Sequence, residues 1–228
     1  MTFKLNKLIV VSAVMLATTL LSACATRKPY DYSAFKAARP ASILVLPPLN
    51  SSPDIEATYS VMAQTTLPLA ESGYYVYPVT LVDETFKQNG FTAPADIHNV
   101  SVSKLREIFG ADAALYINVK QYGTKYMVIS SETRVTAEAK LVDLRSGATL
   151  WSGAATASSA EGDNNSGGLI AMLVTAAIRQ IVETISSKGH LIAGVASTRL
   201  LMAGQPVGNG ILYGPRSPMH LKDGVPAN

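Results

Sequence analysis

The chain is poor in the residues from which most metal and cofactor sites are built. It has 228 residues but one cysteine, Cys24, and three histidines, His98, His190 and His220. A single thiol cannot form a disulfide within the chain, and no histidine has another His, Cys or carboxylate at the spacing of a metal site. We therefore expect no metal site and no cofactor, and a fold whose stability rests on its apolar core.

Recognisable catalytic motifs are also missing. No Gly-X-Ser-X-Gly segment occurs, which would contain the nucleophile of many hydrolases. The glycines of Glu161–Gly168 resemble a phosphate-binding loop, but the Gly-Lys-Ser/Thr ending is absent and a flexible loop is the simpler interpretation. Six carboxylates stand near expected helix starts, where they stabilise free N–H groups, although sequence leaves their pairing in space open. These are Asp54, Glu56, Asp83, Glu84, Asp96 and Asp112. We predict that the chain is not an enzyme and has no catalytic residue.

The charge balance argues against nucleic acid as a partner. Two of the 19 Lys and Arg residues, Lys4 and Lys7, lie within the first 23 positions, so 17 remain against 16 acidic residues. A nucleic-acid-binding domain normally has a clustered basic face. We expect no nucleic-acid partner.

What the chain does have is a secretory signal pattern at its amino terminus. Lys4 and Lys7 precede a 14-residue apolar run, Leu8 to Leu21. This length is typical of a signal core and is too short for a membrane-spanning helix, which needs about 20 residues. Residues 1–23 are therefore predicted to be a signal peptide.

The end of that segment resembles the lipobox of bacterial lipoproteins. Leu21, Ser22 and Ala23, which would form the signal-peptidase recognition site, stand directly before Cys24. A lone cysteine can also be a small buried apolar residue. Here, however, a charged start, an apolar core, a leucine three residues before the cysteine and two small residues directly before it occur together. We expect Cys24 to become the acylated amino terminus, to anchor the protein in membrane lipid, and to be followed by a tether over 24–41. Ala25, in place of Asp, favours the outer membrane.

Residues 42–203 are predicted to form one α/β domain with a mixed, partly antiparallel sheet packed by helices. Continuous apolar runs or strict alternation indicate strands, and Gly123 and Gly147 indicate turns between them. The middle of the chain should therefore be an antiparallel meander. The expected strands are 42–46, 74–78, 113–122, 126–131, 135–141 and 149–155.

Helices are predicted where apolar residues recur every three or four positions between capping residues. The first should follow Ser52, with a kink or break at Pro68, and others should begin at Thr80 and Ser101. The clearest pattern covers 169–187, which Gly189 should end. A short turn or helical piece is expected over 94–99.

The carboxyl-terminal part has two further features. A second apolar helical segment, Leu191–Met202, should either cover the other face of the sheet or form an exposed subunit contact through Leu200 and Leu201. Residues 204–228 are rich in Pro and Gly, which predicts an extended surface strand or a disordered tail.

Several segments together resemble one family over about residues 22–216. These are Leu46–Asn50, Pro68–Val76, Gln88–Gly90, Phe109–Ala113, Gln121–Tyr126 and Leu141–Trp151. The family is a proteobacterial group of lipoproteins of unknown function, related to the curli-secretion-channel (CsgG-like) lipoproteins. Its Leu141–Trp151 hairpin also resembles TolB-like amino-terminal domains. The resemblance implies an α/β sandwich and supplies no catalytic residues. It does not imply a pore, because the chain has no pair of long alternating segments free to form membrane hairpins.

Two functions follow from these observations. The first is a non-enzymatic, lipid-anchored outer-membrane protein facing the periplasm, a structural or accessory part of an envelope assembly or secretion system. Its partners would be a second copy or other envelope lipoproteins, and the strand tyrosines would suit such contacts, although ordinary sheet packing also explains them. The alternative is a periplasmic hydrolase or glycan-binding lipoprotein. A pocket with two carboxylates or a Ser–His pair would favour the alternative.

Overall fold

The computed structural model describes residues 30–126, 131–163, 185–205 and 210–223. The signal peptide, Cys24 and most of the helix predicted over 169–187 lie outside these residues. Residues 31–228 form one compact unit.

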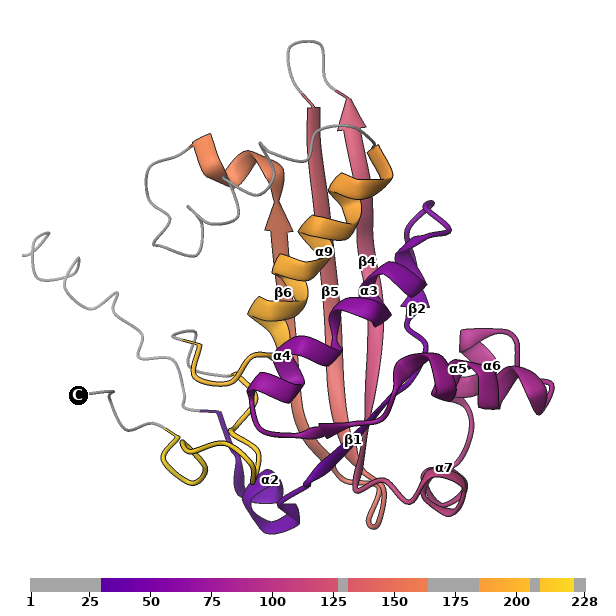
Figure 1. Ribbon diagram of the computed structural model, residues 1–228, viewed down its shortest axis with the longest axis vertical. Coiled ribbons are helices and arrows are strands. Elements are labelled where there is room, and N and C mark those ends of the chain that lie inside the picture. Colours follow the sequence, from indigo (N-terminus) through magenta and orange to yellow (C-terminus); the bar gives the residue numbers. More distant parts are fainter. Residues whose placement is uncertain (1–29, 127–130, 164–184, 206–209, 224–228) are drawn as a thin grey trace, which may run out of the picture. The chain divides into compact units, whose positions relative to one another are not determined.

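A six-stranded mixed sheet is the centre of this unit (Figure 1). The strand order is β3-β1-β4-β5-β6, and β2 also pairs with β4. β3, β1, β2 and β4 pair in parallel, whereas β4, β5 and β6 form an antiparallel meander. The predicted mixed sheet is therefore confirmed. The strands are β1 (Ser42–Val45), β2 (Leu49–Asn50), β3 (Tyr75–Val76), β4 (Ala113–Tyr126), β5 (Ser131–Asp143) and β6 (Thr149–Ser158).

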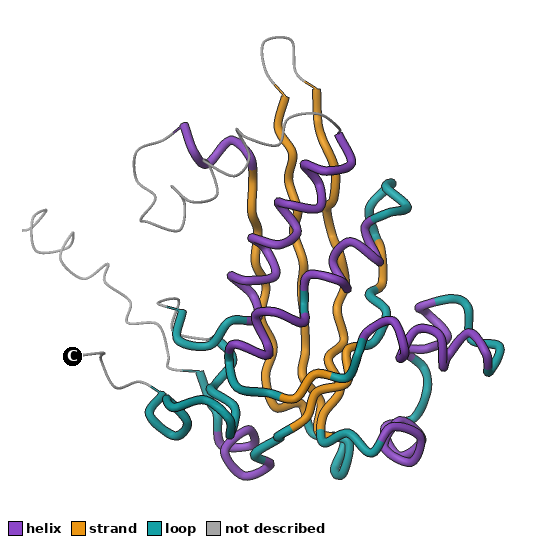
Figure 2. Tube along the Cα trace, in the orientation of Figure 1, coloured by secondary structure: helices purple, strands orange, loops and turns teal. Residues whose placement is uncertain are grey.

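Helices pack on both faces of the sheet. Figure 2 shows helices crossing the long strands on one face and a second group gathered near their lower end. α9, α3 and α4 form the first group, and α5, α6 and α7 contact the second face around Leu44, Ala114 and Val142. The helices are α2 (Ser33–Ala38), α3 (Ala57–Gln64), α4 (Thr66–Glu71), α5 (Val79–Gln88), α6 (Pro94–His98), α7 (Val102–Phe109), the 3-10 helix η2 (Ser159–Asp163) and α9 (Ile185–Leu201). In the described part of the chain, no helix is both long and apolar enough to cross a bilayer.

Asp112 fastens the start of β1 to the β5–β6 turn. Its Oδ2 atom accepts hydrogen bonds from the backbone N–H groups of Ala41 and Ser42, at 3.0 and 3.1 Å. Its Oδ1 atom lies 2.6 Å from a guanidinium nitrogen of Arg145. Burial alone would raise the pKa of Asp112, but these bonds and the Arg145 charge together hold it below its usual range. This carboxylate is thus structural and belongs to no catalytic pair.

Several helix boundaries differ from the sequence prediction. The first helix begins at Ala57, because the side chains of Asn50 and Asp54 accept the N–H groups of Ser52 and Glu56 and hold this segment in turns. Its break falls at Thr65, three residues before Pro68. Since proline crowds the preceding turn, a break ahead of it is expected. α5 similarly begins at Val79, one residue before the predicted cap.

Two glycine predictions were wrong. β4 does not turn at Gly123 but continues to Tyr126, with Gly123 paired to Arg134 of β5. Gly189 does not end a helix and instead lies within α9. A Cβ atom at Gly189 would lie 2.8 Å from the Tyr122 hydroxyl, so glycine permits α9 to approach β4 closely.

The apolar surface of α9 is internal. Leu200 and Leu201 retain 4% and 0% of their exposure. The predicted subunit contact at these two residues is therefore wrong, and the alternative, packing against the rest of the chain, is confirmed. The helix covers β5, β6 and α3, which accounts for its apolar residues.

Residues 210–223 pack onto the domain. The N–H groups of Gly214 and Arg216 donate to the carbonyl oxygens of Ser72 and Gly73, at 2.8 and 3.1 Å. Ile211 is buried, and the Tyr74 hydroxyl bonds to the Leu212 carbonyl. This part of the predicted tail is an ordered cover over the end of α4.

Candidate functional site

The structure brings a serine and a histidine together although they are 130 positions apart. The Nδ1 atom of His190, on α9, lies 2.9 Å from the Oγ atom of Ser60, on α3. The Tyr122 hydroxyl donates to the same Oγ atom at 2.8 Å. This cluster borders a pocket of about 460 Å³, with Glu56 and Tyr59 at its rim.

The direction of these hydrogen bonds opposes a nucleophilic role for Ser60. The side-chain amide nitrogen of Gln64 lies 2.7 Å from Nε2 of His190. An amide nitrogen donates, so in this orientation Nε2 accepts and the ring proton is on Nδ1, from which it donates to Ser60. A general base must instead accept the proton of the serine.

The helix around Ser60 gives a second reason. Its backbone N–H is bonded to the Glu56 carbonyl at 2.9 Å, as expected inside a helix. An oxyanion hole needs free, converging N–H donors, which the interior of a helix does not provide. The cluster therefore fits a polar contact that aligns α3, α9 and β4 better than a hydrolase site.

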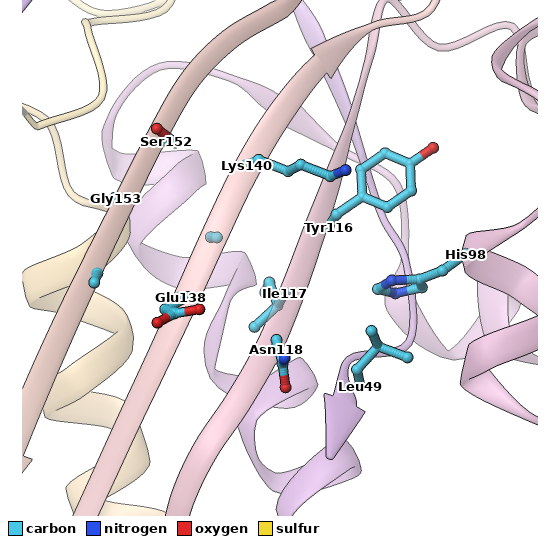
Figure 3. A pocket seen from close by; sticks show the side chains of 11 residues that line it. Leu49, His98, Tyr116, Ile117, Asn118, Glu138, Lys140, Ser152 and Gly153 are labelled. Atoms are coloured by element: carbon cyan, nitrogen blue, oxygen red, sulfur yellow. The ribbon is translucent and has the colours of Figure 1, made fainter. Parts of the chain in front are cut away.

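A second, larger hollow lies on the sheet face opposite α9. It has a volume of about 580 Å³ and is walled on one side by Leu49 of β2 and His98 of α6. Its floor is the antiparallel part of the sheet, where two rows of cross-strand neighbours meet (Figure 3). The rows are Tyr116, Lys140 and Ser152, and Asn118, Glu138 and Ala154.

The two lysines in and beside the hollow differ in their ion pairing. Glu138 forms an ion pair with Lys120, with 3.1 Å between Oε2 and Nζ. The Lys140 ammonium lies 5.0 Å from the centre of the Tyr116 ring, and among the described residues no carboxylate is within ion-pair distance of it. Among the described residues, the Lys140 cation in the hollow therefore contacts an aromatic face and no carboxylate.

His98 is the titratable group at the edge of the hollow. Its Nε2 atom lies 3.0 Å from the Pro47 carbonyl oxygen, and its ring packs edge-on against Tyr116 at 5.2 Å. Burial lowers the pKa of His98, the hydrogen bond to Pro47 opposes this, and the Lys140 charge lowers it further. His98 is thus neutral near pH 7. Because the carbonyl can only accept, Nε2 carries the proton and Nδ1 is an acceptor.

Neither cluster was predicted from the sequence. His98 lies in the segment 94–99, for which the sequence predicts only a short turn or helical piece, and Ser60 and His190 have no motif around them. Among the described residues, no group of three or more His, Cys, Asp and Glu side chains could hold a metal ion. The lipobox residues Leu21, Ser22, Ala23 and Cys24 lie outside the described part, so the structure does not test them.

Comparisons with known proteins identify the family. The model of the family described as "Putative lipoprotein GNA1162-like" matches residues 30–216. The chain belongs to this family. A relative in Neisseria meningitidis serogroup B, named "Putative lipoprotein NMB1124/NMB1162", is 51% identical over 203 residues, which is 88% of this chain and 93% of the relative.

A solved structure agrees with the fold of this GNA1162-like lipoprotein. The crystal structure of lipoprotein GNA1162 from Neisseria meningitidis is 53% identical, with a TM-score of 0.52, and covers 64% of this chain and 100% of its own. A PelC dodecamer from Paraburkholderia phytofirmans is 17% identical, with a TM-score of 0.42, over 70% of this chain and 88% of its own. That likeness is too low to say anything about assembly here.

Proposed function

We propose that this family member is a lipid-anchored outer-membrane lipoprotein that faces the periplasm and is a non-enzymatic, structural or accessory component of an envelope assembly or secretion system. The observation that carries the proposal is the Leu21-Ser22-Ala23-Cys24 segment in a chain whose family and close relative are named lipoproteins. The hydrogen bond between Ser60 and His190, in which the imidazole donates and so cannot act as a base, supports the non-enzymatic part. A relation to the curli-secretion-channel lipoproteins belongs to the same proposal.

The anchor is tested by removing its attachment atom. Cys24→Ala should abolish labelling with radioactive palmitate and leave an unprocessed or soluble precursor, because no other thiol can accept the lipid. Ser22→Ala keeps a small residue before the cleavage site and should be labelled like the wild type. Unchanged labelling of Cys24→Ala would refute the lipobox interpretation.

The proposed partner is a second copy of this chain or another envelope lipoprotein. The test is to purify the acylated protein from outer membranes after brief crosslinking and to identify what remains attached. Sedimentation of a soluble form that starts after Cys24 then separates the two cases. Self-association indicates a second copy, and a monomer at high micromolar concentration leaves the heterologous partner. Recovery of the crosslinked protein alone, with a monomeric soluble form, would contradict an assembly role.

The second candidate, a periplasmic hydrolase, depends on the 2.9 Å contact between Ser60 and His190. If the Gln64 amide rotated, His190 could accept from Ser60 and the pair could react. A fluorophosphonate probe would then label the wild type and not Ser60→Ala, with Ser158→Ala as a control. We expect no labelling of any of the three. Labelling that Ser60→Ala alone abolishes would favour the hydrolase.

A further inference from the structure

The hollow above β4, β5 and β6 has the features of a ligand site. Its volume of about 580 Å³ is within the range of small-molecule sites, which are typically apolar with a few convergent polar groups. Leu49, Tyr116 and Ala154 supply apolar surface, and Lys140, His98 and Asn118 supply polar groups of different character.

Each polar group can make a defined type of contact. Lys140 offers a cation without a carboxylate partner among the described residues. Asn118 accepts a hydrogen bond from the Ser51 hydroxyl through Oδ1, at 3.0 Å, so its Nδ2 group is left to donate. His98, held by Pro47 through Nε2, offers Nδ1 as an acceptor.

Two of these groups, Lys140 and His98, lie beside one aromatic ring. The Lys140 ammonium and the His98 ring both pack against Tyr116, at 5.0 and 5.2 Å from its centre, and Figure 3 shows both beside that ring. A ligand lying there would meet a cation and an acceptor, with the Asn118 amide in the neighbouring cross-strand row of the floor. A carboxylate next to an amide N–H matches this set of groups, because the carboxylate accepts from Lys140 and Asn118 and the N–H donates to His98.

We propose that this hollow binds the carboxyl terminus of a peptide chain, with the terminal carboxylate at Lys140 and Asn118 and the preceding amide N–H at Nδ1 of His98. The site uses none of the lipobox residues, and the ligand is bound without being chemically changed. Small apolar side chains on the ligand suit it, because Ala154 and Gly153 in the lining present little but apolar surface.

The probe is acetyl-Ala-Ala with a free carboxylate, compared with the same dipeptide as a carboxamide. Binding to the full-length acylated protein in detergent micelles is followed by calorimetry or by NMR shifts of the probe. The acid should bind about tenfold more tightly than the amide, the size expected for one charge-assisted hydrogen bond.

Matched lysine variants locate the site. Lys140→Gln should reduce affinity for the acid to that for the amide, whereas Lys104→Gln, on α7 and outside the lining of the hollow, should leave it unchanged. His98→Phe should weaken both probes, because it removes the acceptor and keeps a ring against Tyr116. Melting temperatures establish that each variant is folded.

Three outcomes would overturn the proposal. Equal affinity for acid and amide would remove the role of the carboxylate. Equal losses in the two lysine variants would show a diffuse charge effect. Absence of binding to the folded wild type at millimolar probe would show that the hollow is not a site for this ligand.

Discussion

At the scale of single residues, His98, at the edge of the hollow, makes the stability of the folded protein depend on pH. Its pKa is lowered in the folded protein, first by burial, whereas an unfolded histidine titrates near pH 6.5. Below about pH 6.5 the unfolded chain therefore binds a proton that the folded chain resists. This contribution to stability is complete above that pH and is lost as the pH falls towards the lowered pKa.

We expect the free energy of unfolding to decrease between pH 7 and pH 5, and His98→Gln to flatten the decrease. Gln retains an amide donor for the Pro47 carbonyl but does not titrate. Asp112, whose pKa is also lowered, acts in a separate window, because its contribution is lost only below about pH 4. Urea unfolding at half-unit pH intervals measures the slope. Parallel curves for wild type and His98→Gln would contradict the assignment.

Gly73 shows how one residue can hold the carboxyl-terminal segment. Its φ angle is +94°, and a Cβ atom there would lie 2.4 Å from the backbone nitrogen of Ser217. Gly90 has a similar φ of +84° but has nothing within 4 Å of that position. Comparing the same substitution at the two glycines therefore separates the cost of backbone strain from the cost of a steric clash.

Gly90→Ala should cost about 1 kcal/mol, the backbone penalty alone, and Gly73→Ala should cost clearly more. Gly73→Ala should also expose residues 210–223 to limited proteolysis, because the added methyl group displaces the segment from Ser72 and Gly73. Equal losses of stability and equal proteolysis in the two variants would show that this packing contributes little.

At the scale of elements, α9 supplies the cover for one face of the sheet. Leu201 is fully buried, whereas Leu67 on α4 is 64% exposed. Leu201→Ala should lower the free energy of unfolding by about 2–5 kcal/mol, because a cavity remains in the core. Leu67→Ala should change it by at most about 0.5 kcal/mol. Denaturant unfolding of both variants makes the comparison, and a small effect at Leu201 would contradict the packing of α9.

The elements also show which parts of the fold were predictable from sequence. The start of α7 was predicted closely because its signal is local: the Ser101 side chain accepts the Lys104 N–H. The strands β4 and β5 were predicted from alternation, which a strand with one buried face imposes directly, and β6 was predicted from the turn at Gly147. The prediction at Gly189 was wrong because this glycine serves a tertiary contact, the close approach of Tyr122. In the sequence, a glycine that permits close packing cannot be distinguished from one that ends a helix.

The candidate sites could not be predicted from sequence patterns, because they also depend on tertiary contacts. Ser60 and His190 meet only because α3 and α9 lie on the same face of the sheet. Lys140 and Tyr116 are opposite each other only in the β4–β5 register, and His98 reaches Tyr116 from a separate helix. No motif spacing encodes such contacts. The fold class, by contrast, follows from periodicity within each segment.

At the scale of the whole molecule, the anchor and the folded unit are separate parts of the chain. Each buried methylene of an acyl chain contributes about 0.8 kcal/mol, so three chains on Cys24 would suffice for stable attachment. Residues 31–228 form a compact unit. We expect its membrane location to depend on the residue after the cysteine.

Ala25 should therefore determine the membrane in which the protein resides. Aspartate at this position retains lipoproteins in the inner membrane of enterobacteria, and alanine does not. In an enterobacterial host, Ala25→Asp should move the acylated protein from the outer to the inner membrane fraction, measured by sucrose-gradient separation and immunoblotting. Ala25→Ser, which adds no charge, should remain in the outer membrane. Palmitate labelling should be equal in both variants, because Cys24 is intact. An unchanged distribution of Ala25→Asp would mean that a contact with an outer-membrane partner, and not the sorting residue, retains the protein there.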